Sequence, residues 1–410
     1  MRILITTWSS RRVGGAETYV GRVMAQLHAA GHRIGFCFET DEPRERAPIA
    51  LPAGTVSFHL AAGVEAALAA IRGWRPDVNY AHGLLSPDLE ERLLGLAPGV
   101  CFAHSYYGTC ISGDKTHKFP IVQPCGRRFG AACLALYFPR RCGGLSPLAM
   151  VRSYSRQRHR LALLHRYAAV VTHSEHMRRE FLRHGVAGGR VYNLHRSAPH
   201  DSMPIAPASL AAPRREGPWQ LMFVGRMDRL KGGSALLEAL PAVAAAAGRP
   251  LRVGFAGDGP ARRAWEEQAR AVMAATPGLA VEFTGWLAQD SLTAKLDETD
   301  IVVVPSLWPE PFGLVGPEAN RRGIPVVAYA SGGIPEWLED GVNGCLAPGD
   351  PPTVAGLAEA LVRCLHSLAS GNALRVGAWR MGHAHPDDVH IGALVDILAL
   401  AAAADGHATT

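Results

Sequence analysis

The sequence predicts an α/β protein with two doubly wound domains, and two observations support this fold class. Short apolar runs alternate with helix-patterned segments along the chain, an order typical of a parallel sheet covered by helices on both faces. The chain has 410 residues, more than one hydrophobic core ordinarily organises. With 48% apolar and 19% charged residues, the composition is globular rather than disordered.

The alternation of apolar runs and helical segments occurs twice, once in each half of the chain. The predicted strands of the first half are residues 2–6, 33–38, 56–60, 78–81, 100–104, 170–174 and 191–194. Those of the second half are residues 221–224, 251–256, 281–284, 301–304 and 325–330. We therefore expect an N-terminal domain over residues 1–198 with an insertion at 105–168, and a C-terminal domain over residues 218–385.

The two domains are predicted to be joined by a linker, because residues 199–217 are rich in Pro and Ala and lack a helix or strand period. A last helical segment, residues 386–410, is expected to pack back onto the N-terminal domain. The opening apolar run is too short for a signal peptide, and the apolar stretch at 391–404 is shorter than the ~20 residues of a membrane span. We expect a cytoplasmic protein.

The positive charge is concentrated in one part of the chain. Residues 115–196 hold 16 Lys or Arg and only two acidic residues, Glu175 and Glu180, while the whole chain has a net charge of +6. Residues 146–166 have the pattern of a basic amphipathic helix, which suits peripheral contact with an anionic membrane; a solvated helix face is the alternative. Nucleic acid is not expected as a partner, because the span lacks interleaved aromatic residues and a known binding motif.

Two carboxylates, Glu310 and Glu318, follow the predicted strand at residues 301–304. Pro and Gly residues between them exclude one continuous helix, so Glu310 belongs to a loop and Glu318 to the helix that follows. The first amides of a helix after a parallel strand lack partners and favour anions. We expect the amides of residues 313–316 to face a phosphate, with Glu318 accepting hydrogen bonds from sugar hydroxyls. The candidate phosphate-binding residues are Gly313, Leu314 and Val315.

Cations and glycines follow two other predicted strands. Arg226 and Lys231 lie in a glycine-flanked loop after residues 221–224 and suit a diphosphate, with Arg as a planar fork and Lys as a point charge. Gly15 follows the first strand in Gly14-Gly15-Ala16-Glu17, where paired glycines allow close backbone approach to a ligand. A tight turn without a ligand is the alternative there. Residues 257–260, Gly-Asp-Gly-Pro, are predicted to be a turn beside the cation loop.

Taken together, these motifs resemble glycosyltransferase family 4, a family of retaining nucleotide-sugar glycosyltransferases. The shared motifs are Gly-Gly-x-Glu, Val-Gly-Arg followed by Lys-Gly, Gly-Asp-Gly-Pro, Glu-x7-Glu and the glycine- and proline-containing run at 323–336. The match is strong over residues 221–350 and looser in the first half. The resemblance implies the GT-B fold, in which two Rossmann-like domains face each other across the active site.

By the same resemblance, the chain would transfer a sugar from a UDP- or GDP-sugar to a hydroxyl acceptor with retention, without a cofactor or a metal. Arg226 and Lys231 would neutralise the donor diphosphate, Glu318 would hold the ribose, and Glu310 would lie beside the transferred sugar. Gly15 would also contact the donor. The acceptor would be a saccharide, a lipid-linked sugar or a small molecule, in the assembly of a cell-surface polysaccharide or glycolipid.

Two histidines at predicted strand ends are further candidates. His104 matches a histidine that family members present to the donor sugar or the reaction centre, although a structural role is the alternative. His82 is a weaker candidate for lining the acceptor side. A sugar-nucleotide epimerase and an inactive glycosyltransferase-like binding protein remain the competing functions. The second is disfavoured because the cations and both carboxylates of the expected site are all present.

A cysteine cluster lies inside the predicted insertion. Cys110, Cys125, Cys133 and Cys142 occur within 33 residues but contain no Cys-x-x-Cys spacing. A structural zinc site, disulfides and separate thiols all stay open for these residues.

Overall fold

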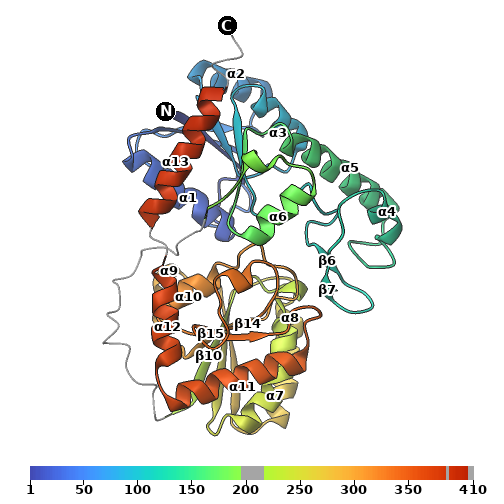
Figure 1. The fold of residues 1–410 in the computed structure, drawn as a ribbon, viewed down its shortest axis with the longest axis vertical. Helices are drawn as coiled ribbons and strands as arrows, with labels where there is room; N and C mark the ends of the chain where they lie inside the picture. Colours follow the sequence, from blue (N-terminus) through green and yellow to red (C-terminus); the bar gives the residue numbers. More distant parts are fainter. Residues whose placement is uncertain (195–216, 385–386, 405–410) are drawn as a thin grey trace. The chain divides into compact units, whose positions relative to one another are not determined.

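The computed structural model describes residues 1–194, 217–384 and 387–404 (Figure 1), and these form two compact units. Unit 1 contains residues 1–114, 127–194 and 388–404, and unit 2 contains residues 115–126 and 217–384. The predicted insertion is therefore divided between the units. Its residues 115–126 include a two-stranded antiparallel ribbon of β6 (Thr116–His117) and β7 (Gln123–Pro124), which pairs with neither large sheet.

Unit 1 is built on a parallel sheet of seven strands in the order β3-β2-β1-β4-β5-β8-β9, counted over the described residues. The strands are β1 (Arg2–Ser9), β2 (Arg33–Thr40), β3 (Val56–His59), β4 (Val78–Ala81), β5 (Gly99–Phe102), β8 (Ala169–Thr172) and β9 (Val191–Asn193). The helices are α1 (Gly15–Ala29), α2 (Val64–Trp74), α3 (Pro87–Leu94), α4 (Ala132–Leu136), α5 (Pro147–Leu164), α6 (Glu175–Arg183), the 3-10 turn η1 (Gly188–Arg190) and α13 (Asp387–Ala404).

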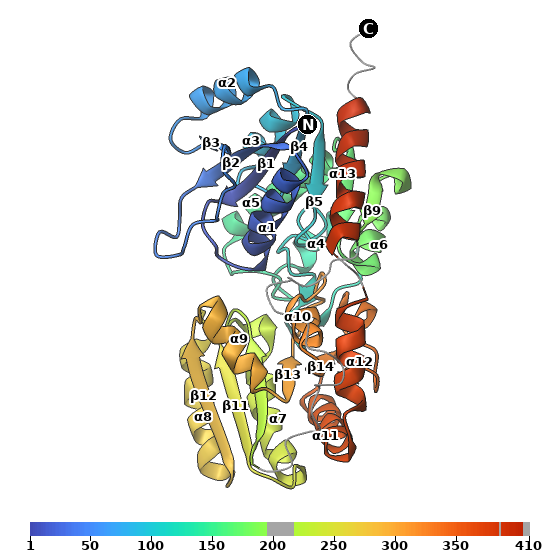
Figure 2. The same ribbon diagram turned by 90° about the vertical axis from the view of Figure 1, so that its left-hand side faces the viewer.

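The alternating side chains of β1 separate the two cores of unit 1. Ile3 and Ile5 face α1 and α13 and share a core with Leu394 and Leu398, so the last helix of the chain packs in the first unit. Leu4 faces the opposite side and packs with residues of α2 and α3. Figure 2 shows α1 and α13 beside the sheet of this unit.

Unit 2 contains a second parallel sheet, whose strand order is β12-β11-β10-β13-β14-β15. Its strands are β10 (Trp219–Val224), β11 (Leu251–Ala256), β12 (Leu279–Gly285), β13 (Ile301–Val304), β14 (Val326–Tyr329) and β15 (Gly344–Ala347). Its helices are α7 (Gly233–Ala246), α8 (Arg262–Ala275), α9 (Gln289–Asp297), α10 (Val315–Arg321), α11 (Val354–Ser370), α12 (Ala373–Gly382) and the 3-10 turns η3 (Arg229–Lys231) and η4 (Ile334–Glu336).

The same alternation divides the core of unit 2. Ile301 and Val303 of β13 pack in the core covered by α7, α8 and α11, whereas Val302 and Val304 pack with residues of α9 and α10. In both sheets the strand order reverses beside the first strand, at β1 in unit 1 and at β10 in unit 2. Ligands of open α/β sheets bind outside the carboxyl ends of the strands at such a switch point.

Every strand predicted from the apolar runs is present, with shifted ends in several cases. The sequence reasoning missed β15, β6 and β7. His104 does not end a strand as predicted, because β5 stops at Phe102 and His104 lies in the loop beyond it. The predicted linker, residues 199–217, lies outside the described residues apart from Gly217. The expectation that the two domains face each other across the active site stays a prediction.

Candidate functional site

The loops that follow β10 and β13 are fastened to each other at the switch point of unit 2. The Leu307 amide donates to the Leu230 carbonyl at 2.8 Å. Gly232 has a φ of +74° and lies so close to Pro305 that a Cβ atom would be 1.7 Å from the Pro305 carbonyl oxygen. Only glycine fits such a backbone conformation and approach without displacement. Lys231, between Leu230 and Gly232, is thereby held against the loop after β13.

Lys231 and Glu310 are in direct contact. The Lys231 Nζ lies 2.7 Å from Glu310 Oε1, and the Ser306 hydroxyl donates to the same oxygen at 2.5 Å. Glu310 Oε2 accepts no hydrogen bond from any residue that the structure describes. The Lys231 ammonium also lies 5.2 Å from the centre of the Trp308 ring. The cation expected at the diphosphate and the carboxylate expected at the sugar thus form one cluster.

The backbone of Glu310 is fixed by a third loop, which follows β14. The Gly333 amide donates to the Glu310 carbonyl at 2.8 Å, and Glu310 forms an isolated parallel bridge with Gly332. A Cβ on Gly332, whose φ is +68°, would lie 2.2 Å from the Glu310 carbonyl oxygen. The glycine pair of the sequence motif therefore allows a close approach of backbone to backbone. With 4% of its surface exposed, Glu310 is buried in this junction.

Arg226 lies in the same loop as Lys231 but is far more accessible. Its side chain is 72% exposed, and its Nε donates to Asp228 Oδ2 at 3.1 Å. The other Asp228 oxygen accepts from the Leu230 amide at 3.0 Å and caps the turn η3. A Cβ on Gly257 would lie 2.0 Å from the Gly225 carbonyl oxygen, so the Gly-Asp-Gly-Pro turn packs against this loop as predicted.

The turn before α10 presents backbone amides beside Glu310. Within the described chain, the amides of Gly313, Leu314 and Val315 donate to no hydrogen bond, and Gly313 has a φ of +84°. The expectation for Gly316 was wrong, because its amide donates to the Gly313 carbonyl at 3.1 Å and a Cβ there would lie 1.9 Å from the Trp337 ring. The absence of a side chain at Gly316 leaves space for the indole ring of Trp337. Glu318 lies in the first turn of α10 and is half-buried.

Three histidines follow neighbouring strands at the carboxyl edge of the sheet in unit 1. His82 follows β4, His104 follows β5 and His173 follows β8. His82 Nδ1 and His104 Nε2 are 2.9 Å apart, so one ring nitrogen donates to the other. His173 was missed by the sequence reasoning, because it lay inside the predicted strand 170–174, whereas β8 ends at Thr172. The candidate His104 therefore belongs to a histidine cluster and is positioned by a histidine neighbour.

Tyr19 of α1 connects this cluster with the last helix. Its ring is 5.6 Å from the His173 ring and 6.0 Å from the His104 ring, centre to centre. Its hydroxyl is 2.9 Å from the Tyr80 hydroxyl and 3.1 Å from His390 Nε2. Because His390 belongs to α13, the end of the chain contributes a side chain to the carboxyl edge of the first sheet.

The Gly-Gly-x-Glu motif has a structural role that the sequence did not reveal. Glu17 is buried and accepts from the Gly14 amide at 2.8 Å and from Trp8 Nε1 at 2.8 Å. Its carboxylate therefore caps the start of α1, where negative charge is favourable. Gly15 begins the helix and is exposed. Its predicted contact with the donor stays a prediction.

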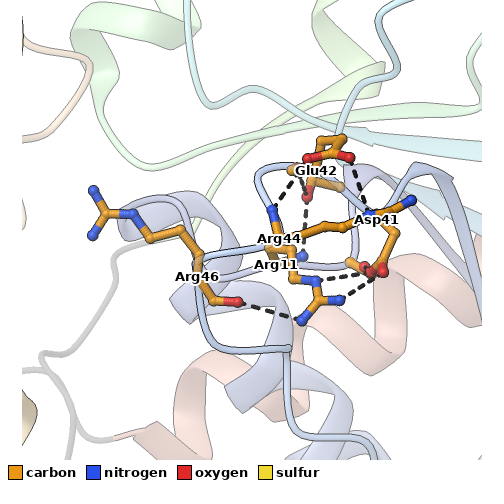
Figure 3. A network of polar contacts seen from close by, with 7 residues as sticks. Arg11, Asp41, Glu42, Arg44 and Arg46 are labelled. Carbon is orange, nitrogen blue, oxygen red and sulfur yellow. Dashed lines mark hydrogen bonds and ion pairs between the residues drawn. The ribbon is translucent and has the colours of Figure 1, made fainter.

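An ion-pair network fastens the loop after β2 to the loop after β1 (Figure 3). Arg11 donates to both oxygens of Asp41, at 2.9 Å from Nε and 2.6 Å from Nη2, and also to the Arg46 carbonyl at 3.4 Å. The Ser10 hydroxyl donates to Asp41 as well. Hydrogen bonds from Arg11 and Ser10 lower the pKa of Asp41 to about 2. The network shapes one end of the carboxyl edge of unit 1.

The cysteine cluster of the insertion holds no disulfide, and all eight cysteines are thiols. Within residues 1–194, 217–384 and 387–404, no group of three or more His, Cys, Asp or Glu side chains is arranged to hold a metal ion. The zinc site expected for Cys110, Cys125, Cys133 and Cys142 stays a prediction, because Cys125 belongs to unit 2 and the other three belong to unit 1.

The predicted basic helix is α5, which begins after Ser146 as its N-cap. Its outer surface combines exposed apolar residues, Leu148 and Val151, with exposed Arg152, and Leu145 before it is 83% exposed. Arg160 is instead buried and donates to the Leu84 carbonyl at 2.5 Å. Among the described helices, none has the length and apolarity needed to cross a bilayer.

Comparison with known proteins finds glycosyltransferase family models over both halves of the chain. The family model for glycosyltransferase family 4 matches residues 13–197, and the model for glycosyl transferases group 1 matches residues 218–367. A D-inositol 3-phosphate glycosyltransferase of Corynebacterium kroppenstedtii is 37% identical over 137 residues, which are 32% of this chain and 30% of the relative. A glycogen synthase of Mycobacterium tuberculosis is 36% identical over 159 residues, which are 38% of this chain and 36% of the relative.

These matches span about a third of the length of the curated relatives. Solved structures are similar over almost the whole chain. Sucrose-phosphate synthase of Thermosynechococcus elongatus has a TM-score of 0.72 at 20% identity, covering 97% of this chain and 98% of its own. HepE of Anabaena, solved with UDP and glucose, has a TM-score of 0.65 at 19% identity with the same coverage. With a family 4 model over residues 13–197 and a group 1 model over residues 218–367, which together cover most of the chain, the protein belongs to the glycosyltransferases.

Proposed function

We propose that this protein transfers a sugar from a nucleotide-diphosphate sugar to a hydroxyl acceptor, with the donor bound at the switch point of unit 2. The observation that carries the proposal is the contact of Lys231 with Glu310 beside the amides of residues 313–315. Cation and amides suit a diphosphate, and the carboxylate suits a sugar hydroxyl. The neighbour HepE, which was solved with UDP and glucose, supports a UDP-sugar as the first donor to test; a GDP-sugar is the second.

The reaction requires one bond to break and one to form at the anomeric carbon. The bond from that carbon to the diphosphate oxygen breaks, the acceptor oxygen bonds to the carbon, and the acceptor proton passes to the departing diphosphate. Negative charge develops on the diphosphate, so fixed cations there stabilise the transition state more than the ground state. In this proposal Lys231 and Arg226 supply that charge, which makes a metal ion unnecessary, and Glu318 holds the ribose hydroxyls.

The proposed stereochemistry is retention, with the acceptor attacking on the face from which the diphosphate leaves. Glu310 positions the sugar and stabilises positive charge at the anomeric carbon, and it forms no covalent bond to the sugar. In support, the Glu310 Oε1 is occupied by Lys231 and Ser306 while Oε2 accepts no hydrogen bond among the described residues. We also propose that His104 acts at the reaction centre and that His82 orients its ring.

The acceptor is proposed to be anionic or lipid-linked, because residues 115–174 contain no acidic side chain. The apolar and basic outer surface of α5 would then contact an anionic membrane. Sedimentation with phosphatidylglycerol vesicles and with phosphatidylcholine vesicles tests this contact. We expect binding only to the anionic vesicles and its loss in Leu148→Asp, whereas Leu400→Asp, which replaces an exposed leucine of α13, serves as the control.

The donor is tested with a panel of UDP- and GDP-sugars. We expect one of them to raise the unfolding temperature and, with a saccharide or lipid-linked acceptor present, to release its nucleoside diphosphate in EDTA. Dependence of that release on an added metal would refute the metal-independent mechanism. A ligand at 100 times its Kd adds about 2.7 kcal/mol of stability.

Glu310→Gln should lower turnover with little change in nucleotide affinity, and Lys295→Ala, which removes an exposed lysine paired with Glu282, is the control. Release of free nucleotide together with an altered sugar, without an acceptor, would indicate the epimerase instead.

A further inference from the structure

We propose that Ser306 is a positioning residue for Glu310, and that it keeps this carboxylate in place when Lys231 turns to the donor diphosphate. The inference rests on the proposed function, since it concerns the state in which the donor is bound. It assigns separate tasks to the two oxygens of Glu310. Oε1 is the anchor, and Oε2 receives the sugar.

The anchor is made by two donors of different kinds. Lys231 Nζ and Ser306 Oγ both reach Glu310 Oε1, at 2.7 Å and 2.5 Å. Lysine is a point charge on a long flexible stem, and the Lys231 side chain is 28% exposed. Serine has a short side chain, and Ser306 is 2% exposed. One partner of Glu310 can therefore move toward a ligand, and the other cannot.

A bound diphosphate competes with Glu310 for Lys231. It carries more negative charge than a carboxylate, and the three donors of an ammonium group can turn toward it. Once Lys231 turns, the Ser306 hydroxyl is the only remaining side-chain donor to Glu310 among the described residues. The hydrogen bond from Ser306 then prevents rotation of the carboxylate, which would remove Oε2 from the sugar.

The backbone around Ser306 explains why this bond persists. Ser306 follows Pro305, whose carbonyl oxygen lies against Gly232, and precedes Leu307, whose amide donates to Leu230 at 2.8 Å. Both neighbours thus contact the loop that carries Lys231. The Glu310 carbonyl is held separately by the Gly333 amide at 2.8 Å. Donor and acceptor of the bond are each fixed by backbone contacts that do not involve Lys231.

The test compares Ser306→Ala and Ser306→Cys with Ser306→Thr, which retains the hydroxyl. Thr299→Val is the matched control, because Thr299 is also buried, lies before the opposite end of β13 and donates to the Lys295 carbonyl at 2.8 Å. The donor that stabilises the parent protein most in the nucleotide-sugar panel is used. Its turnover gives kcat and KM, and calorimetry with UDP and GDP gives the Kd of the nucleotide part.

We expect kcat to fall by about tenfold or more in the alanine and cysteine variants of Ser306, because a misplaced group commonly costs this much. The Kd for UDP or GDP should stay within roughly twofold, since Lys231 and the amides remain. Ser306→Thr should recover much of kcat, and Thr299→Val should have the parental value. If Ser306 had a purely structural role, its alanine and cysteine variants would have a lower unfolding temperature, and kcat and nucleotide affinity would fall together.

Two results would overturn the inference while leaving the proposed function intact. One is parental kcat in Ser306→Ala, and the other is a loss of nucleotide affinity as large as the loss of kcat. If Ser306→Ala does not fold, the cysteine and threonine variants give the same comparison. A parent protein that neither binds nor turns over any donor of the panel would refute the proposed function itself, and with it the role of Ser306.

Discussion

The ion pair of Lys231 with Glu310 predicts a measurable coupling between the two residues in the absence of any ligand. The perturbation is Lys231→Met, Glu310→Gln and the two changes together. Lys231→Met leaves a buried carboxylate with Ser306 as its one side-chain donor in the described chain. Glu310→Gln leaves an ammonium that can turn toward water. The double variant leaves neither charge, so it should be less destabilised than the sum of the single changes.

The expected magnitude follows from the burial of each partner. The Glu310 side chain is 6% exposed and that of Lys231 is 28% exposed. Removing one partner of a fully buried pair costs roughly 3–5 kcal/mol. Because Lys231 is partly solvated and Ser306 remains, we expect about 2 kcal/mol for Lys231→Met and about 1 kcal/mol for Glu310→Gln. The double variant should cost about 1.5 kcal/mol, which gives a coupling of about 1.5 kcal/mol.

Urea unfolding followed by tryptophan fluorescence is the appropriate assay. Six of the eight tryptophans lie in unit 2, so the signal reports mainly on the unit that carries the ion pair. The slope with urea must be the same in all four proteins, because a changed slope signals a changed unfolding reaction. Single changes that add within about 0.5 kcal/mol would show that the two side chains do not interact, and would refute both the ion pair and the argument from it.

Three other predictions concern residues of the two units. Glu318→Ala should weaken UDP or GDP binding by about tenfold, as lost hydrogen bonds to a ribose imply; unchanged affinity in calorimetry would contradict its assignment. Gly232→Ala should cost roughly 2–4 kcal/mol of unfolding free energy through its clash with a carbonyl, while Gly248→Ala, at a similar φ but with open space, should cost only about 1. Equal losses of stability would exclude the clash. Hydrogen bonds from Arg11 and Ser10 lower the pKa of Asp41 from 3.8 to about 2, so the stability that they give the folded state is present above pH 3.8 and is lost as the pH falls toward 2. Asp41→Asn should therefore have a lower unfolding temperature than the parent at pH 7, and the difference should narrow over that acid range.

The strands and the location of the donor motifs were predictable because they depend on local pattern and on chain order. Apolar runs such as 301–304 mark buried parallel strands, and the carboxyl ends of neighbouring strands meet at one edge. Lys231 and Glu310 were accordingly placed in one site from motifs that are 79 residues apart in the sequence. The roles predicted for them, Lys231 at the donor diphosphate and Glu310 beside the transferred sugar, came from the family resemblance.

Direct contacts were not predictable, because they depend on rotamers and on backbone approaches of a few ångströms. Ser306 gave no signal in the sequence as the partner of Glu310, and Gly316 was taken for a ligand-facing residue although it accommodates Trp337. The pairing of His82 with His104 also required coordinates. The strand β15 was missed because its short segment, residues 344–347, lacks a pattern that distinguishes it from a loop.

The position of α13 has a consequence for synthesis of the chain. Its residues Leu394 and Leu398 belong to the same core as Ile3 and Ile5, yet they leave the ribosome after every strand of unit 2. During synthesis, the face of the N-terminal sheet that α13 covers is therefore exposed while the strands of unit 2 are translated. Domains usually fold in the order of translation. Here the unit that begins first is completed last, so part of its apolar face stays exposed until α13 has been made.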